Sequence, residues 1–175
     1  MSTPDPAAAR PAGTGPKLFF TGSVVLYLAC WVVAAVRLPE RVPLHFGGSG
    51  QPDRWGGRGE ALIVFAVLGV VLVALFGAVA FARFPIDMVN VPHKEWWTAT
   101  PERVARLRGM IRDDALRFAT ATMVLLSALI LLTLRASLLD EPRLDAAAYL
   151  AVGAYLAWTL GYTWRIYRGR YRPEE

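Results

Sequence analysis

The sequence has few of the residues that support catalysis or cross-linking. Its 175 residues include one cysteine and two histidines, so Cys30 has no partner for an internal disulfide. The chain contains no P-loop, no GxSxG nucleophile motif and no HExxH zinc motif. We therefore expect a protein that is not an enzyme and that holds no cofactor or metal.

Charged residues are missing from four long segments. No Asp, Glu, Lys or Arg occurs in residues 18–36, 61–82, 118–134 or 146–164. Since roughly 20 apolar residues cross the core of a bilayer, the sequence predicts four transmembrane helices, at about 18–36, 61–82, 118–138 and 146–164. A water-soluble four-helix bundle would show a charged face on its helices, and none of these segments has one. The lack of ionisable groups at membrane depth also argues against an ion-coupled transporter.

The basic residues are spread unevenly over the remaining segments. An even number of spans puts both termini and the long 83–117 connection on one side, with 13 lysines and arginines, against six in the two other loops. By the positive-inside rule the richer side is cytoplasmic. The sequence thus predicts a multi-pass protein with two cytoplasmic termini and a 37–60 loop that faces outward. This distribution accounts for the net charge of +5 without a nucleic-acid partner.

The other segments outside the spans have distinct compositions. Residues 1–17, rich in Pro, Ala and Gly, are expected to form a disordered cytoplasmic leader. Residues 101–117 are amphipathic and follow a helix-start signal, Thr100-Pro101-Glu102. They either lie on the inner leaflet or extend the third helix. Residues 165–175 form a basic, tyrosine-rich tail that suits lipid headgroups. The predicted fold is an all-α, four-helix integral membrane bundle with an outer Gly/Pro-rich loop and a cytoplasmic amphipathic helix.

Small residues recur along the fourth predicted helix. Gly153, Ala157 and Gly161 are spaced four residues apart, and a face of small residues lets two helices approach closely. Packing within the bundle is the first interpretation of this face, and a homodimer contact is the second.

The outward loop contains the stretch "LPERVPLHFGGSGQPDRWGGR", residues 38–58, and six of the thirteen residues 47–59 are glycine. Two prolines favour extended backbone, one glycine can take a positive φ in the turn, and the tryptophan suits a membrane interface. Every second residue from Val42 is apolar, which predicts an extended segment with His45 on its opposite side. The residues expected to build this loop are Pro39, Pro43, Phe46, Gly50 and Trp55.

Three polar residues of the loop, His45, Asp53 and Arg58, are not required for turn formation. A histidine and a carboxylate eight residues apart across a glycine turn could share a hydrogen bond or a metal ion. Two ligands are too few for a convincing zinc site. The pair could equally tie the loop together. A third hypothesis is that all three residues contact a ligand, since loops on rigid scaffolds often carry function.

This loop resembles the signature of a bacterial membrane domain of unknown function that also forms the N-terminal part of SdpI-type immunity proteins. The matching positions are Leu38, Pro39, Val42, Pro43, His45, Phe46, Gly50, Asp53, Trp55, Gly56 and Arg58. The segment "NVPHKEWW", residues 90–97, looks like a second motif of the same family. Its matching residues are Asn90, Pro92, Lys94 and Trp97. The resemblance covers residues 18–97.

SdpI-type proteins protect cells against a secreted peptide toxin. The resemblance therefore implies a non-enzymatic protein of the bacterial cytoplasmic membrane that senses or neutralises an extracellular ligand such as a peptide. The alternative is an accessory subunit of a membrane transporter or signalling complex, which would dock through small-residue helix faces. In both cases the lipid bilayer is an expected partner.

Overall fold

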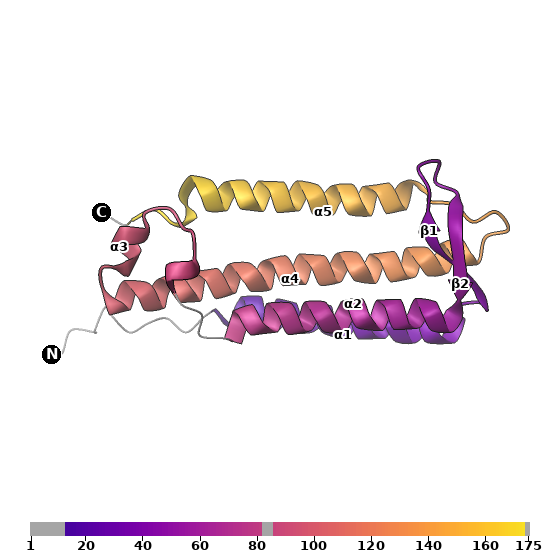
Figure 1. Ribbon diagram of the computed structural model, residues 1–175, viewed down its shortest axis with the longest axis horizontal. Coiled ribbons are helices and arrows are strands. Elements are labelled where there is room, and N and C mark those ends of the chain that lie inside the picture. The colour runs from indigo at the N-terminus through magenta and orange to yellow at the C-terminus, as the bar shows by residue number, and fades with distance from the viewer. Residues whose placement is uncertain (1–12, 82–85, 174–175) are drawn as a thin grey trace.

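The computed structural model describes residues 13–81 and 86–173, which form an elongated bundle with a β-hairpin across one end (Figure 1). Four helices are long, and the remaining elements are short. The long helices are α1 (Thr14–Arg37), α2 (Arg58–Phe81), α4 (Pro101–Ser137) and α5 (Ala146–Arg165). The short elements are β1 (Arg41–Phe46), β2 (Pro52–Gly57), the 3₁₀ turn η1 (Ile86–Met88), α3 (Lys94–Thr98) and the π-helical turn η2 (Ile166–Arg170). The protein is mainly helical, as expected, but the predicted all-α fold lacks the hairpin.

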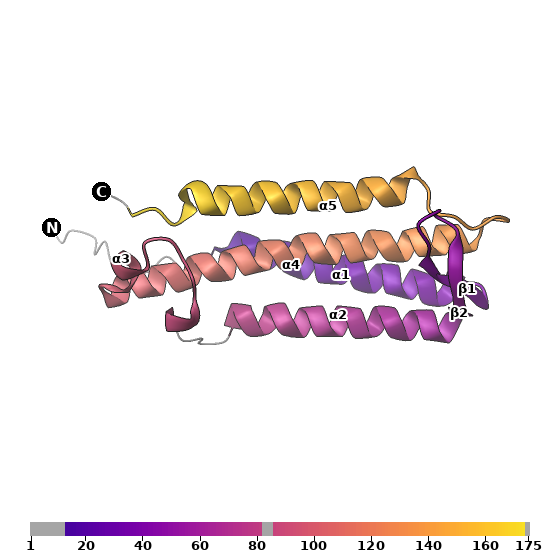
Figure 2. The same cartoon turned by 45° about the horizontal axis from the view of Figure 1, so that its top comes forward.

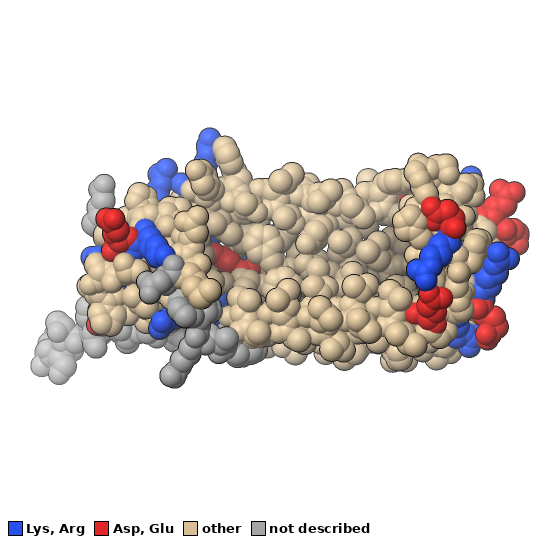
Figure 3. Space-filling model, in the orientation of Figure 1, with Lys and Arg blue, Asp and Glu red and all other residues tan. Residues whose placement is uncertain are grey.

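Three of the described helices, α1, α2 and α4, are long and apolar enough to cross a membrane, which is compatible with a multi-pass membrane protein. The helix α5 is not among them, because Tyr, Trp, Thr and Gly lower its hydropathy. It runs beside α4 in both ribbon views (Figures 1 and 2). Charged side chains gather toward the two ends of the molecule, and a broad uncharged belt lies between them (Figure 3).

The helix α4 lies at the centre of the bundle and packs against α1, α2 and α5. Its buried Met123 and Ile130 meet Tyr27, Cys30 and Ala34 of α1 in the main core. The contacts of α5 are chiefly with α4, so much of its apolar surface stays exposed. In a membrane this surface would face lipid.

Polar contacts fasten α1 to α2. The indole Nε1 of Trp31 donates to the carbonyl oxygen of Leu62 at 3.0 Å, and the Tyr27 hydroxyl donates to the carbonyl oxygen of Phe65. A Cβ atom on Gly69 would collide with the Tyr27 ring. The glycine therefore permits the close approach of the two helices that these hydrogen bonds require.

Two expectations for the helix ends are settled by α1 and α4. The amphipathic segment 101–117 extends the third long helix, so α4 is continuous over 37 residues. Thr100 is its N-cap, as predicted, and the Thr100 side chain accepts from the backbone N–H of Arg103 at 3.4 Å. Helix α1 already begins at Thr14, so the expected leader is wrong for residues 14–17. Residues 1–12 of that leader lie outside the described residues.

Candidate functional site

The glycine-rich loop folds as an antiparallel hairpin of β1 and β2. Arg41 pairs with Gly57 and Pro43 with Trp55, and the register shifts between Pro43 and Phe46. Irregular pairing of this kind bends a hairpin and turns individual side chains out of the regular alternation. Val42 and Pro43 are both buried, Phe46 is half-buried, and His45 is exposed. The hairpin therefore buries its first half against the helix ends and presents His45 to solvent.

The hairpin tip is anchored by backbone hydrogen bonds. Gly50 has φ +78°, a left-handed conformation that glycine adopts without strain. The N–H of Gly50 donates to the carbonyl of Gly47, and the carbonyl of Gly50 accepts from the N–H of Leu144, both at 2.9 Å. The buried Gly50 thus holds the tip against the segment that leads into α5.

His45 and Asp53 are brought together at the outer edge of the hairpin. Nδ1 of His45 lies 2.6 Å from Oδ1 of Asp53, and 66% and 53% of the two side chains are exposed. No group of three His, Cys, Asp or Glu side chains that could hold a metal occurs among the described residues. The structure therefore gives the pair a hydrogen bond, with Nε2 of the imidazole left for other contacts.

Arg58 does not join this pair. Its guanidinium lies 2.8 Å from Oε1 of Glu40. Glu40 lies in the short segment that links α1 to β1. Arg54 pairs in turn with Glu60. The guanidinium of Arg41 lies 4.3 Å from the centre of the Trp55 ring. Of the three residues proposed to contact a ligand, the structure brings two together and gives the third a partner of its own.

The loop-building prolines and tryptophan lie where the hairpin meets the helices. Pro39 is half-buried just after α1, and Pro43 is buried in β1. Trp55 is half-buried in β2, beneath the Arg41 guanidinium. Leu38, between α1 and the hairpin, is 1% exposed and belongs to the main core. These residues make the hairpin continuous with the packed bundle.

The opposite end of the bundle contains a buried carboxylate with several donors, which the sequence analysis did not single out. Asp114 of α4 has a side chain that is 7% exposed. The hydroxyls of Tyr162 and Tyr171 donate to it at 2.6 Å and 2.7 Å. Nε of Arg170 lies 2.6 Å from Oδ1, and the guanidinium of Arg117 lies 3.3 Å from the same oxygen. We call these five residues the Asp114 cluster.

The Asp114 cluster joins α4, α5 and the tail. Burial, together with the hydrogen bond to Asp114, raises the pKa of the Tyr171 hydroxyl above its ordinary range. For Arg170, burial opposes the charged form, but the contacts with Asp114 outweigh it, so its pKa is also raised. Both directions mean that the fold favours a protonated Tyr171 and a charged Arg170 beside the carboxylate.

The cluster packs part of the tail against the bundle. Tyr171 is 5% exposed, and its carbonyl accepts from the indole N–H of Trp97 at 3.1 Å. Trp97 is 2% exposed and packs with Leu107 in a second small core. Trp96 is half-buried beneath the guanidinium of Arg103, 3.9 Å from its ring centre.

The other residues of the second motif lead into α3. Asn90 and Pro92 are exposed, and Lys94 is half-buried at the first position of that short helix. They lie at the end of the bundle that is far from His45 and Asp53. A signal for the missed cluster was present in α4, since Asp114 follows Leu107 and Ile111 at helical spacing and therefore shares their apolar face.

The small-residue face of α5 points away from the bundle. Gly153, Ala157 and Gly161 are exposed, and an added Cβ on either glycine would meet nothing within 4 Å. The face that meets α4 instead contains Ala148, Tyr155 and Tyr162; the Tyr155 hydroxyl lies 3.1 Å from Oγ1 of Thr122. The prediction that the small residues pack within the bundle is therefore wrong. Residues spaced seven apart lie on one face of a helix, and the two tyrosines at this spacing make the contacts with α4.

Comparison with known proteins gives partial matches. A family model described as "Domain of unknown function (DUF1648)" matches residues 22–70, which span most of α1, the hairpin and the first half of α2. The second motif, residues 90–97, lies outside that match. An uncharacterized protein of Archaeoglobus fulgidus is 39% identical over 61 residues, which are 32% of this chain and 33% of that relative. The chain thus spans about a third of the length of the curated relative. No solved structure matches the chain significantly. The family match includes the hairpin with His45 and Asp53.

Proposed function

We propose that the chain crosses the cell membrane four times and holds its hairpin outside. Three helices with the length and hydropathy of spans support this topology, and α5 runs beside α4 as a fourth helix of 20 residues. The excess of basic residues in the termini and the 83–117 connection supports their cytoplasmic placement. The uncharged belt between the two charged ends has the character of a lipid-facing surface (Figure 3).

We further propose that the hairpin recognises an extracellular ligand, the role implied by the resemblance to immunity proteins. The observation that carries this proposal is the exposed His45–Asp53 pair. Five other charged residues of the loop take part in ion pairs or in a cation–π contact: Glu40 with Arg58, Arg54 with Glu60, and Arg41 with Trp55. The pair therefore offers an oriented imidazole and a carboxylate to a partner, on a hairpin that is fixed at its base and at its tip.

A peptide is the ligand class that suits this pair. Nε2 of His45 and the oxygens of Asp53 can bond to backbone N–H and C=O groups or to polar side chains. Because the hairpin is anchored through Gly50 and through its buried first half, its groups are ordered before a ligand arrives. Ordering in advance lowers the entropic cost of binding.

A deletion strain tests the recognition proposal. The strain is challenged with spent medium of related organisms and is complemented with the wild type, His45→Ala or Asp53→Ala at matched amounts in the membrane. We expect the wild type to restore resistance and the two variants to fail. Glu40→Gln, which changes another exposed charge of the same region, is the matched control and should complement. Equal sensitivity of the deletion strain and the parent would remove the basis for the proposal.

A second candidate role, an accessory subunit of a membrane complex, is favoured by the outward face of α5. Gly153, Ala157 and Gly161 leave an exposed strip on which another transmembrane helix could pack. The test fills both ends of this strip by introducing Gly153→Leu and Gly161→Leu together. Loss of a stoichiometric membrane protein from the purified material of this variant would favour the accessory role. If the variant instead converts an oligomer of this chain into monomers and no other protein is lost, the strip is a homodimer contact.

A further inference from the structure

A hollow with several arginines lies at the tail end of the bundle, between the first turns of α4 and the end of α5. Its volume is about 680 Å³. Four arginines line it, and no acidic residue is among the described residues that do so. The arginines are Arg106, Arg165, Arg168 and Arg170. We call this space the arginine hollow. Its apolar side is formed by Met110 and Trp164.

Three of the arginines of the hollow differ in their contacts. Arg170 is paired with Asp114, but the same carboxylate also receives Arg117, so one carboxylate faces two guanidinium groups. The guanidinium of Arg168 lies 4.2 Å from the centre of the Trp164 ring; this contact orients the side chain and leaves its charge intact. Arg165 is exposed at the same rim. Planar guanidinium groups arranged in this way suit a phosphate group, which they can bind through paired hydrogen bonds.

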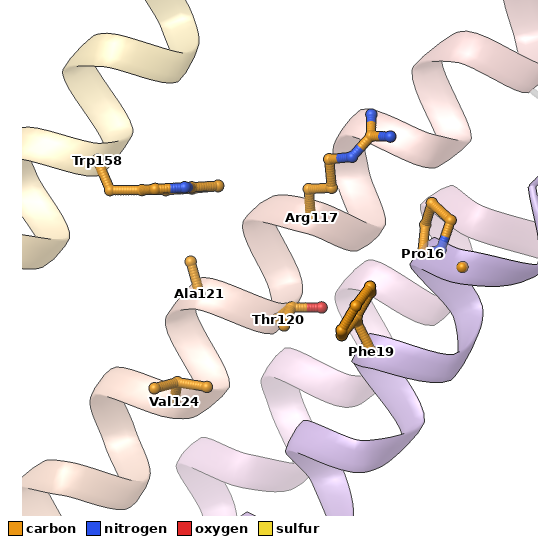
Figure 4. Close-up of a pocket in the computed structure, with 8 residues that line it drawn as sticks. Pro16, Phe19, Arg117, Thr120, Ala121, Val124 and Trp158 are labelled. Atoms are coloured by element: carbon orange, nitrogen blue, oxygen red, sulfur yellow. The ribbon is translucent and has the colours of Figure 1, made fainter.

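A second, apolar hollow lies nearer the middle of α4. Its volume is about 480 Å³, and it lies between α1, α4 and α5. Figure 4 shows Trp158 of α5 facing Ala121 of α4, with Phe19 of α1 beside Thr120. Arg117 lines the edge of this apolar hollow and also belongs to the Asp114 cluster.

Helical periodicity places both hollows on one side of α4. The lining residues Arg106, Met110, Arg117, Ala121 and Val124 follow spacings of four, seven, four and three, which keep them on one face. With a rise of 1.5 Å per residue, Met110 and Val124 lie about 20 Å apart along the axis. The two hollows therefore lie on one side of α4, the cationic one toward the start of the helix and the apolar one farther along it, with Asp113 and the Asp114 cluster between them along the helix.

We propose that the two hollows together bind an anionic phospholipid, with its phosphate in the arginine hollow and an acyl chain along Val124 and Trp158. The proposal rests on the membrane placement proposed above, in which the arginine hollow lies at the cytoplasmic interface and the apolar hollow at hydrocarbon depth. A lipid without net charge would not use the positive charge of the arginine hollow. A soluble phosphate ester would leave the apolar hollow empty. An amphiphile with an anionic phosphate headgroup matches both parts.

Lipid binding to the purified full-length chain tests the proposal. The chain in a neutral detergent is titrated with phosphatidylglycerol or with phosphatidylcholine, and bound lipid is counted by native mass spectrometry. We expect the wild type to prefer phosphatidylglycerol. The variant Arg165→Gln/Arg168→Gln should lose that preference by about tenfold or more, since each basic group near an anionic headgroup contributes roughly a factor of five. The variant Arg54→Gln/Arg143→Gln removes two arginines from the hairpin end and should bind like the wild type.

Three further measurements distinguish a lipid from a soluble phosphate ester, and the lipid proposal from the recognition proposal. Glycerol 3-phosphate should compete weakly; full competition at equal concentration would overturn the lipid proposal in favour of a soluble ester. Val124→Trp, which narrows the apolar hollow, should weaken lipid binding, provided that its melting temperature stays near that of the wild type. Equal binding of the two lipids, or unchanged binding by Arg165→Gln/Arg168→Gln, would overturn the site. His45→Ala should bind lipid normally, so failure of the recognition proposal leaves this result unaffected.

Discussion

The two ends of the bundle hold their charges in opposite ways. At the hairpin end, His45 and Asp53 pair in the open, with more than half of each side chain exposed. At the tail end, the side chain of Asp114 is 7% exposed and receives hydrogen bonds from residues of α4, α5 and the tail. Water can compete with Asp53 for its histidine partner, whereas Asp114 is almost fully shielded from water.

The difference fits the recognition role proposed for the His45–Asp53 pair and a role in folding for Asp114. An exposed ion pair contributes little to stability, because water and salt compete with it. Its side chains can therefore exchange partners at low cost. A buried carboxylate is stabilised only while its donors stay in place. We expect substitutions at the tail end to change stability, and substitutions at the hairpin edge to change function with little effect on stability.

The largest effect is expected for Asp114→Ala. The substitution leaves two buried tyrosine residues and the half-buried Arg170 without their acceptor, and removal of one partner from a buried pair costs about 3–5 kcal/mol. Thermal unfolding in detergent, followed by circular dichroism, measures the change. The matched control is Asp113→Ala, the neighbouring and only half-buried carboxylate. Equal losses for the two variants would mean that Asp114 is not special.

A smaller loss is expected for Tyr171→Phe, which removes one hydroxyl donor and keeps the ring. Loss of a hydrogen bond to a charged group costs about 1.5–3 kcal/mol. The exposed Tyr167 supplies the control, since Tyr167→Phe should leave the unfolding temperature unchanged. A Tyr171→Phe variant as stable as the wild type would show that the remaining donors suffice for Asp114.

The same residue gives the tail end a dependence on alkaline pH. Folding raises the pKa of Tyr171, so its contribution to stability is complete below the ordinary tyrosine value of about 10. The contribution declines as the pH rises through that value toward the higher pKa of the folded state. The unfolding temperature, measured between pH 8 and pH 11, should fall more steeply with pH for the wild type than for Tyr171→Phe. Parallel curves would contradict the assignment.

An intermediate effect at the hairpin end is expected for Gly50→Val. The left-handed φ of Gly50 strains a β-branched residue by about 1–3 kcal/mol. A side chain there would also approach the Tyr149 hydroxyl, 3.5 Å from the added Cβ. Gly48→Val is the control, because Gly48 has open space around it and does not share the positive φ. Unchanged melting of Gly50→Val would show that the tip is not held as described.

The smallest effect on stability is expected for His45→Ala and Asp53→Ala. An exposed pair of this kind contributes about 0–1 kcal/mol. Their melting temperatures should therefore lie close to that of the wild type, even where the variants fail to protect cells. A loss of stability as large as that of Asp114→Ala would assign the pair to folding instead of recognition.

Local sequence features predicted much of the fold. The lengths of the apolar segments marked all four long helices, and the Thr100-Pro101 start marked the beginning of α4. The positive φ of Gly50 and the proximity of His45 to Asp53 followed from the turn and from alternation in the strand. These features depend on residues that are close in the chain, so they could be predicted from the spacing of residues in the sequence.

Long-range contacts were beyond the same reasoning. Tyr171 and Asp114 are 57 positions apart, and no periodicity links a tail residue to a particular helix face. The small residues of α5 illustrate a related limit. Their spacing showed that Gly153 and Gly161 share one face, but the aromatic Tyr155 and Tyr162 decided which face meets α4. The strand β2, with its two glycines, has weak intrinsic preference for a sheet and forms through its pairing with β1.

The most direct test of the two-ended arrangement is cysteine labelling on intact cells. In a Cys30→Ser background, single cysteines replace Ser49 at the hairpin tip, Glu141 between α4 and α5, Asn90 before α3, or Arg172 in the tail; all four positions are exposed. An impermeant thiol reagent should label the cysteines at positions 49 and 141 and spare those at 90 and 172 until the cells are opened. Labelling of 90 and 172 with protection of 49 and 141 would place the hairpin inside the cell and contradict the recognition role. Labelling of 172 together with 49 would show that α5 does not cross the membrane.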